Sequence, residues 1–111
     1  MAYDEELAER IREVIEPGPE LTERKMFGGL AFLIGGNMAV AASGKGGLLV
    51  RVDPRHGDDL LDGSHVQSMV MGGRDIDGWL RVSAEAVRAE AALREWVDRG
   101  VAYARSLPAK R

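Results

Sequence analysis

The segment that most constrains the fold is residues 25–34, Lys-Met-Phe-Gly-Gly-Leu-Ala-Phe-Leu-Ile, which contains both phenylalanines of the chain. The pair Gly35-Gly36 follows it, and residues 38–42 are apolar again. Two successive glycines suit a two-residue hairpin turn, since type I′ and II′ turns need positive φ angles. The pattern predicts a strand over residues 24–34 that returns as a second strand over residues 38–42.

Helices are predicted near both ends of the chain. Asp4 suits an N-cap, and apolar residues at 7, 11, 14 and 15 form one buried stripe before Pro17, which predicts a helix over residues 4–16. A second helix is predicted after Ser83, with a short turn over 84–87 and a longer part ending near residue 107 before Pro108. Its expected buried positions are Leu93, Trp96, Val97, Gly100, Tyr103, Ala104 and Leu107.

Further apolar runs predict strands over residues 48–52, 66–71 and 76–82, with a turn at 43–47 and one helical turn near 58–61. The fold class is therefore α+β, in the order α-β-β-β-β-β-α. We expect a single domain over residues 1–111, with an antiparallel sheet of about five strands and both helices mainly on one face.

The Gly35-Gly36 turn also predicts which residues share a face of the sheet. It pairs Leu33 with Met38, Ala31 with Val40 and Gly29 with Ala42, and it places them with Phe27 beneath the helices. Residues 48, 50 and 52 join the same face. The opposite face would then carry Met26, Gly28, Leu30, Phe32, Ala39, Ala41, Leu49 and Arg51.

That opposite face is more apolar than the solvent side of an antiparallel sheet usually is. It predicts a surface that binds a second copy or another protein through Met26, Leu30, Phe32, Leu49 and Arg51. Two alternatives are that one helix covers each face, or that the register is shifted by one residue. Because Phe27 and Phe32 have opposite parity, either Gly28-Gly29 forms a bulge or Phe32 belongs to a second buried surface.

Composition excludes several classes of function. The absence of cysteine excludes disulfides and thiol catalysis, and with no secretory signal pattern we expect a cytoplasmic location. No apolar run approaches the roughly 18 residues that a membrane span needs. The net charge of −3 argues against direct nucleic-acid binding, which usually requires a strongly basic face.

No motif nominates a catalytic, metal or cofactor site. Residues 43–47, Ser-Gly-Lys-Gly-Gly, look like a phosphate-binding loop, but the lysine is followed by glycines and a strand, which favours a hairpin turn. His56 and His65 lie among Asp53, Asp58, Asp59 and Asp62, yet the spacing fits no compact ligand pattern. The serines and the single threonine show no nucleophile motif. We therefore predict no catalytic residues, no metal and no cofactor.

One group of side chains suggests a different kind of binding. Trp79 and Arg81 alternate onto the same strand face, and Arg51 would lie on a neighbouring strand. An aromatic ring between arginines can stack on bases or hold phosphates. An amphipathic outer face of the sheet explains the three residues equally well.

Several segments carry a family resemblance along the whole chain. They are residues 1–8 (Met-Ala-Tyr-Asp-Glu-Glu-Leu-Ala), Lys25-Met26-Phe27-Gly28-Gly29 with the following Leu-Ala-Phe, residues 36–40, Gly78-Trp79, Trp96-Val97 and residues 104–108. In this order they resemble the TfoX N-terminal-domain family, named for the TfoX/Sxy regulators of natural competence. The resemblance makes Lys25, Met26, Phe27, Gly28, Gly29 and Trp79 the family signature. It implies an α+β fold with an antiparallel sheet.

In full-length competence regulators this domain is followed by a C-terminal domain, and they act with a cyclic-AMP-responsive transcription factor. We expect the present sequence to be a stand-alone N-terminal domain, and the resemblance supplies no catalytic residues. The sequence thus predicts a bacterial regulatory domain that binds a protein, a transcription factor being one candidate, with a homodimer as the leading form. A nucleic-acid- or small-ligand-binding module using Arg51, Trp79 and Arg81 is the alternative, and an uncharacterised enzyme is the third.

Overall fold

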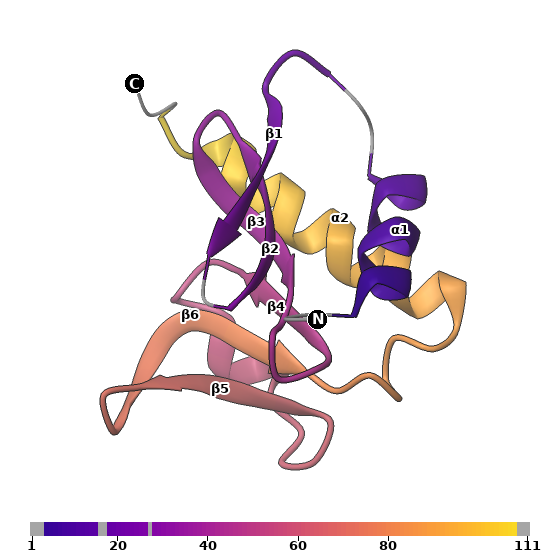
Figure 1. The fold of residues 1–111 in the computed structure, drawn as a ribbon. Helices are drawn as coiled ribbons and strands as arrows, with labels where there is room; N and C mark the ends of the chain where they lie inside the picture. Colours follow the sequence, from indigo (N-terminus) through magenta and orange to yellow (C-terminus); the bar gives the residue numbers. More distant parts are fainter. Residues whose placement is uncertain (1–3, 16–17, 27, 109–111) are drawn as a thin grey trace.

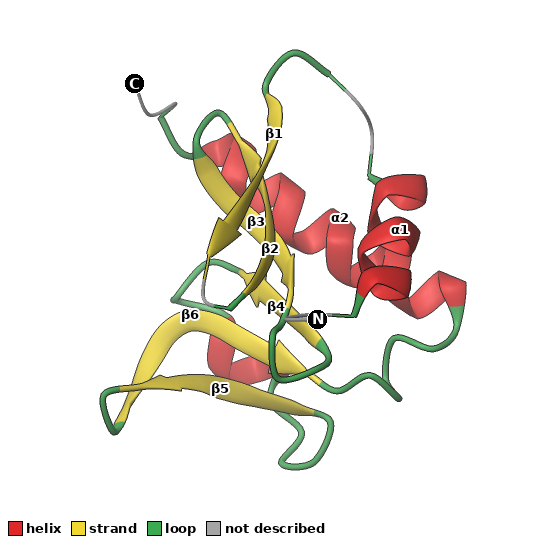
Figure 2. Cartoon of the chain, viewed as in Figure 1, coloured by secondary structure: helices red, strands yellow, loops and turns green. Residues whose placement is uncertain are grey.

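The structure, a computed structural model, describes residues 4–15, 18–26 and 28–108. Two helices pack on one face of a six-stranded antiparallel sheet, with one short 3-10 turn, η1 (Gly57–Leu60), in a connecting loop (Figures 1 and 2). The sheet order is β1-β2-β3-β4-β6-β5. The elements are α1 (Glu5–Val14), β1 (Leu21–Met26), β2 (Gly29–Ile34), β3 (Asn37–Ala42), β4 (Leu48–Arg51), β5 (Val66–Met71), β6 (Arg74–Val82) and α2 (Glu90–Ser106). The α+β class and the two terminal helices are confirmed.

Helix α1 forms where its cap and its apolar spacing predict. The Asp4 carboxylate accepts a hydrogen bond from the Leu7 backbone N–H at 3.1 Å, which satisfies a donor that the first turn leaves unpaired. Leu7, Ile11 and Val14 are buried on one side. Arg12 on the outer side bonds Glu23 of β1 at 2.8 Å and so links the helix to the sheet edge.

Helix α2 buries Leu93, Val97, Gly100 and Ala104, all of which belong to the predicted stripe. The remaining predicted positions are half-buried at its borders: Trp96, Tyr103 and Leu107. No helix of the described residues is long and apolar enough to cross a membrane.

The predicted strand over residues 24–34 is wrong, because two strands occupy this region and the sheet therefore has six strands. β1 and β2 form a hairpin in which Met26 pairs with Gly29, and Gly28 in the turn has a φ of +73°. A positive φ cannot continue a strand, and glycine adopts it without steric cost. The sequence of β1 is mostly polar, so no run of apolar residues marks it as a strand, and its four central residues are exposed. Phe27 lies outside the described residues.

The Gly35-Gly36 turn is confirmed, and so is the pairing of Leu33 with Met38. Beyond that pair the register shifts, so that the β2 partner of Val40 is Phe32 and not Ala31. The extra residue in β3 is Ala39, which forms a β-bulge and resets the alternation. The predicted pairs Ala31–Val40 and Gly29–Ala42 are therefore wrong; Ala31 pairs with Ala41, and Leu30 pairs with Ala42.

This shift exchanges the predicted faces of β2. Phe32 is completely buried in the main core between the sheet and the helices, where Leu30 also packs. Ala31 and Leu33, predicted to lie beneath the helices, face the other side instead. The residues of β4 follow the prediction, with Leu48 and Val50 in the main core and Leu49 on the opposite face.

The opposite face is not an exposed surface, because the sheet covers it with its own strands. Figure 1 shows β5 and β6 running across the direction of β1–β3, as expected for a strongly twisted sheet. Met69 of β5 and Trp79 of β6 thereby belong to one cluster with residues of the first four strands. The members from those strands are Met26, Ala31, Leu33, Met38, Ala41 and Leu49. The prediction of an uncovered apolar face is wrong; in the described part of the chain Val70 is the one exposed large hydrophobic residue.

Gly100 allows α2 to lie directly on the β3 bulge. A Cβ atom at this position would lie 2.4 Å from the carbonyl oxygen of Ala39 and 2.9 Å from a methyl group of Val40. The sheet backbone thus occupies the space that any side chain would need. Glycine inside a helix costs about 1 kcal/mol relative to alanine, and the close packing explains its use here.

We therefore expect Gly100→Ala to destabilise the protein by about 1–3 kcal/mol, because the added methyl overpacks the contact and outweighs the gain in helix propensity. Urea unfolding measures the change. Gly18→Ala is the matched control, since a Cβ there meets nothing within 4 Å. Equal stability of the two variants would contradict the close contact.

Phe32→Ala should cost about 3–5 kcal/mol, the usual loss for a large aromatic side chain removed from a core. Val70→Ala should change stability by less than about 0.5 kcal/mol, because the Val70 side chain is exposed. Chemical unfolding of both variants checks the assignment of Phe32 to the core. A small loss for Phe32→Ala would support the predicted, surface-facing register instead.

Candidate functional site

The family signature around residues 25–29 forms the hairpin turn between β1 and β2. Gly29 lies so close to β3 that a Cβ atom would be 2.0 Å from the carbonyl oxygen of Ala42. Gly28 supplies the positive φ of the turn. Lys25 is exposed, and Met26 is half-buried against the strand cluster. The two glycines are therefore required by the backbone. Of the two alternatives for Gly28-Gly29 and Phe32, the bulge does not form at the glycine pair; a bulge lies at Ala39 in β3.

The structure does not bring the five predicted partner-binding residues together on one surface. Leu30 and Phe32 are buried beneath the helices, and Leu49 is buried on the opposite face of the sheet. Met26 and Arg51 are half-buried. A partner cannot reach this set in the folded chain, so a protein-binding surface must be sought elsewhere.

Arg51, Trp79 and Arg81 separate into two places. Arg51 pairs with Trp79 across β4 and β6, and its guanidinium carbon lies 5.2 Å from the centre of the Trp79 ring. The Tyr103 ring of α2 is 5.6 Å from the same atom. The arginine thus contacts two aromatic rings within cation–π distance. Sequence reasoning missed Tyr103 here, since nothing local relates α2 to the end of β4.

Arg81, two residues further along β6, instead lies in a groove. Its guanidinium donates to the Ser43 hydroxyl at 2.9 Å, and Ser43 is buried in the turn between β3 and β4. Lys45 of the same turn and His65 at the start of β5 line the groove, whose volume is about 370 Å³. These residues come from segments that are distant in the sequence, and only the fold places them together.

Two interactions position His65 in the groove. Its ring Nδ1 lies 2.8 Å from the Ser83 hydroxyl. One carboxylate oxygen of Asp62 accepts hydrogen bonds from the backbone N–H groups of Ser64, His65 and Val66 at 2.8–2.9 Å. These bonds hold the pKa of the Asp62 carboxyl below its usual value, and the bond from Val66 has the largest effect.

The aspartates around the two histidines do not assemble into a metal site in the described part of the chain, where no three His, Asp or Glu side chains lie together. The Asp62 carboxylate accepts hydrogen bonds from the backbone, and Asp53 forms an ion pair with Arg55 at 2.8 Å. The Arg55 side chain holds the pKa of Asp53 at about 2.

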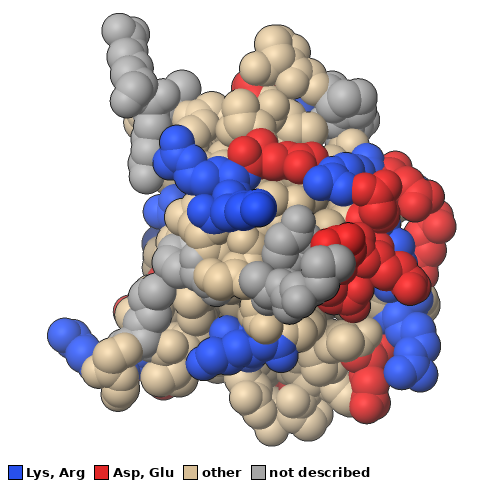
Figure 3. Space-filling model, viewed as in Figure 1, with Lys and Arg blue, Asp and Glu red and all other residues tan. Residues whose placement is uncertain are grey.

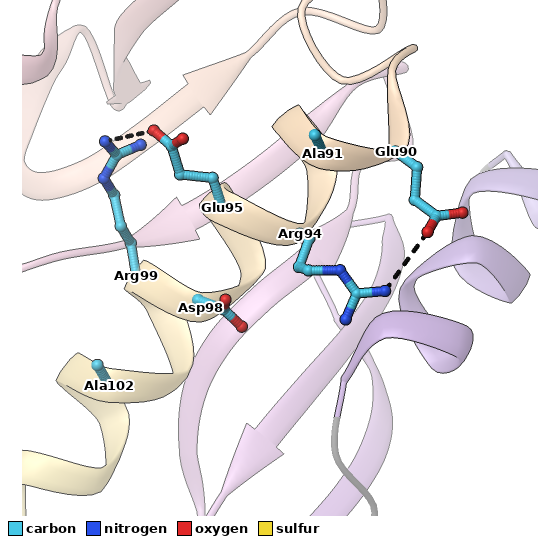
Figure 4. Close-up of a pocket in the computed structure, with 7 residues that line it drawn as sticks. All are labelled: Glu90, Ala91, Arg94, Glu95, Asp98, Arg99 and Ala102. Atoms are coloured by element: carbon cyan, nitrogen blue, oxygen red, sulfur yellow. Dashed lines mark hydrogen bonds and ion pairs between the residues drawn. The ribbon is translucent and has the colours of Figure 1, made fainter.

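The outer face of α2 carries a broad, shallow depression of about 630 Å³ (Figure 4). Its ion pairs, each with i, i+4 spacing, join Glu90 to Arg94 at 3.4 Å and Glu95 to Arg99 at 2.7 Å. Figure 4 shows one pair on the flank nearer α1 and the other on the opposite flank, with Asp98 between them. The small residues of this face are Ala91 and Ala102, and both are exposed.

Acidic residues gather over α1, on the right of the space-filling view (Figure 3). Its exposed carboxylates are those of Glu5, Glu6, Glu9 and Glu13. This acidic surface differs in charge from the basic groove at Arg81 and from the outer face of α2, which carries charges of both signs.

The fold and the signature hairpin define the class as a small α+β domain with a six-stranded antiparallel sheet. The chain belongs to the TfoX N-terminal domain family, whose model matches residues 13–104. Neither a curated protein nor a solved structure matches the chain.

Asp62→Asn should destabilise the protein at neutral pH, because an amide accepts the three backbone bonds less strongly than a carboxylate does. The folded-state pKa is depressed, so the stabilisation is present above the unfolded pKa of about 4 and is lost as pH falls through the lower folded value. The difference in urea midpoint between wild type and variant should therefore shrink below about pH 4. Asp75→Asn, which removes an exposed carboxylate from β6, is the control; a pH-independent difference for Asp62→Asn would contradict this account.

Proposed function

We propose that this chain is a regulatory domain that acts by binding a protein rather than by catalysis, through the outer face of α2. Membership of the TfoX N-terminal domain family supports this role, as does the resemblance to competence regulators that act with a transcription factor. The absence of cysteine fits a cytoplasmic setting.

The observation that carries the proposal is the shape and chemistry of that helix face. Leu93 and Val97 hold the opposite side of α2 in the core, so the helix cannot turn its outer side inward. On the outer side, the small side chains of Ala91 and Ala102 leave room for another element to approach closely. Charged side chains of both signs surround them, as at the rim of many interfaces.

The partner that this face fits best is a second copy of the chain. A two-fold axis perpendicular to α2 brings the same face of each helix together in antiparallel orientation. Because the face carries Glu90 and Glu95 as well as Arg94 and Arg99, the acids of one copy can meet the arginines of the other. The existing pairs are surface ion pairs of small net energy, so exchanging partners costs little.

The size of the face limits the strength of such a dimer. A helix of 17 residues is about 25 Å long. One helix pair of this length buries less than the roughly 1,200 Å² typical of stable interfaces, so we expect weak, concentration-dependent association. A transcription factor is the alternative occupant of the same face.

Sedimentation velocity over a wide concentration range tests the proposal. Wild type should shift toward dimer at high concentration. Ala102→Glu should remain monomeric, because the larger acidic side chain occupies the space that the alanines leave for the second helix. Val70→Glu, on the edge strand β5, should behave like wild type. The proposal fails if wild type stays monomeric at about 1 mM, or if Val70→Glu abolishes association and Ala102→Glu does not.

A further inference from the structure

The groove beside Arg81 has no role in the proposed association, and its composition points to a ligand. Its lining comes from three segments that are distant in sequence: the β3–β4 turn, the start of β5 and the end of β6. The lining residues include arginine, lysine and histidine and no carboxylate. They are Lys45, Gly46, Gly47, Ser64, His65, Gln67, Arg81, Val82, Ser83 and Ala84.

Arg81 is a half-buried cation without a carboxylate partner among the described residues. It lies inside the sheet, paired with Leu49 of β4 and Gln67 of β5, neither of which is charged. Among the described residues, the one hydrogen bond of its side chain, to the hydroxyl of Ser43, occupies part of a guanidinium that has five N–H donors. A partly desolvated charge with spare donors is stabilised when an anion binds it.

The glycines of the turn bring Lys45 to the same groove. Gly47 has a φ of +77°, and a Cβ atom there would lie 2.6 Å from the carbonyl oxygen of Val82 at the end of β6. The turn can therefore lie against β6 only with glycine at this position. The Ser43 hydroxyl also accepts a hydrogen bond from the Lys45 backbone N–H at 3.1 Å, so one side chain links the turn to Arg81.

His65, at the start of β5, is the third basic residue that lines the groove. The Ser83 hydroxyl, which accepts from the Ala86 backbone N–H at 3.2 Å, holds the ring through Nδ1. The backbone of His65 is fixed twice, by Asp62 and by the bond from Ser83 N–H to its carbonyl oxygen at 2.8 Å. The ring is thus positioned by the fold although it is exposed to solvent.

We propose that this groove binds the phosphate group of a small phosphorylated ligand. Donors that approach from three segments suit a tetrahedral oxyanion better than a planar carboxylate, and arginine binds two phosphate oxygens at once. A volume of about 370 Å³ exceeds the need of phosphate alone and leaves room for an organic group.

A small ligand fits the groove better than a nucleic acid does. Only Arg81 and Lys45 carry permanent positive charge there, and the whole chain has a net charge of −3. A nucleic-acid site usually has a longer basic track with aromatic rings on which bases stack. The nearest tryptophan of the strand, Trp79, is packed with Arg51 in the strand cluster.

Titration of the full chain by ¹⁵N NMR tests this proposal with three probes: inorganic phosphate, adenosine monophosphate and a short single-stranded DNA. We expect amide shifts at Gly46, Gly47 and His65 with both small probes, with Kd values of about 1 mM or tighter and the tighter one for the monophosphate. Sodium chloride at matched ionic strength is the control for non-specific charge.

Arg81→Gln should weaken binding of the monophosphate by about tenfold or more, because it removes the charge-assisted pair. Lys45→Gln should weaken it several-fold. Arg74→Gln, at the exposed start of the same strand, should leave the affinity unchanged. If Arg81→Gln does not fold, Lys45→Gln against Lys25→Gln decides the question, since both lysines are exposed.

The proposal is overturned if neither small probe shifts the groove amides, or if the Arg74 and Arg81 variants lose affinity equally. Tighter binding of the DNA with the same dependence on Arg81 would replace the small ligand by a nucleic acid. None of these results depends on whether α2 mediates association, because the titration reports on the groove alone.

Discussion

The contact between Gly100 of α2 and the bulge at Ala39 fixes the arrangement on which the remaining structure depends. The helix backbone rests on the strand backbone without an intervening side chain, which brings Leu93 and Val97 into the core. The bulge in turn resets the alternation of β3 against β2 and aligns Phe32 with Val40. A single extra residue in β3 thus determines which alternate residues of β2 face the helices: Leu30 and Phe32 do, and Ala31 and Leu33 do not.

The twist of the sheet has a direct consequence for function. Because Met69 and Trp79 pack with residues of the first strands, the second face of the sheet is a minor core. Association through that face would require the sheet to open. The two surfaces proposed for binding lie outside this minor core: the outer face of α2, with charges of both signs, and the groove that contains Arg81.

Residues whose conformation is set by their neighbours in sequence were predictable. The Asp4 cap, the stripe of α1, the Gly35-Gly36 turn and the ion pairs on α2 all depend on contacts within about four residues. The division of residues 24–34 into two strands was missed because β1 is polar and its turn contains Gly28, which sequence alone could equally assign to a bulge. The faces of β2 were missed because the bulge lies in its partner strand.

The sequence by itself determined the fold class, the family, the two helices and the turn at Gly35-Gly36, because periodicity, caps and paired glycines act locally. Only the tertiary structure decided the register of β2, the burial of the second face and the meeting of Lys45, His65 and Arg81. Those outcomes depend on which backbones approach each other across the sheet. The segment at 25–34 illustrates both: its glycines mark a turn and a close contact, and the partner strand decides where its phenylalanine lies.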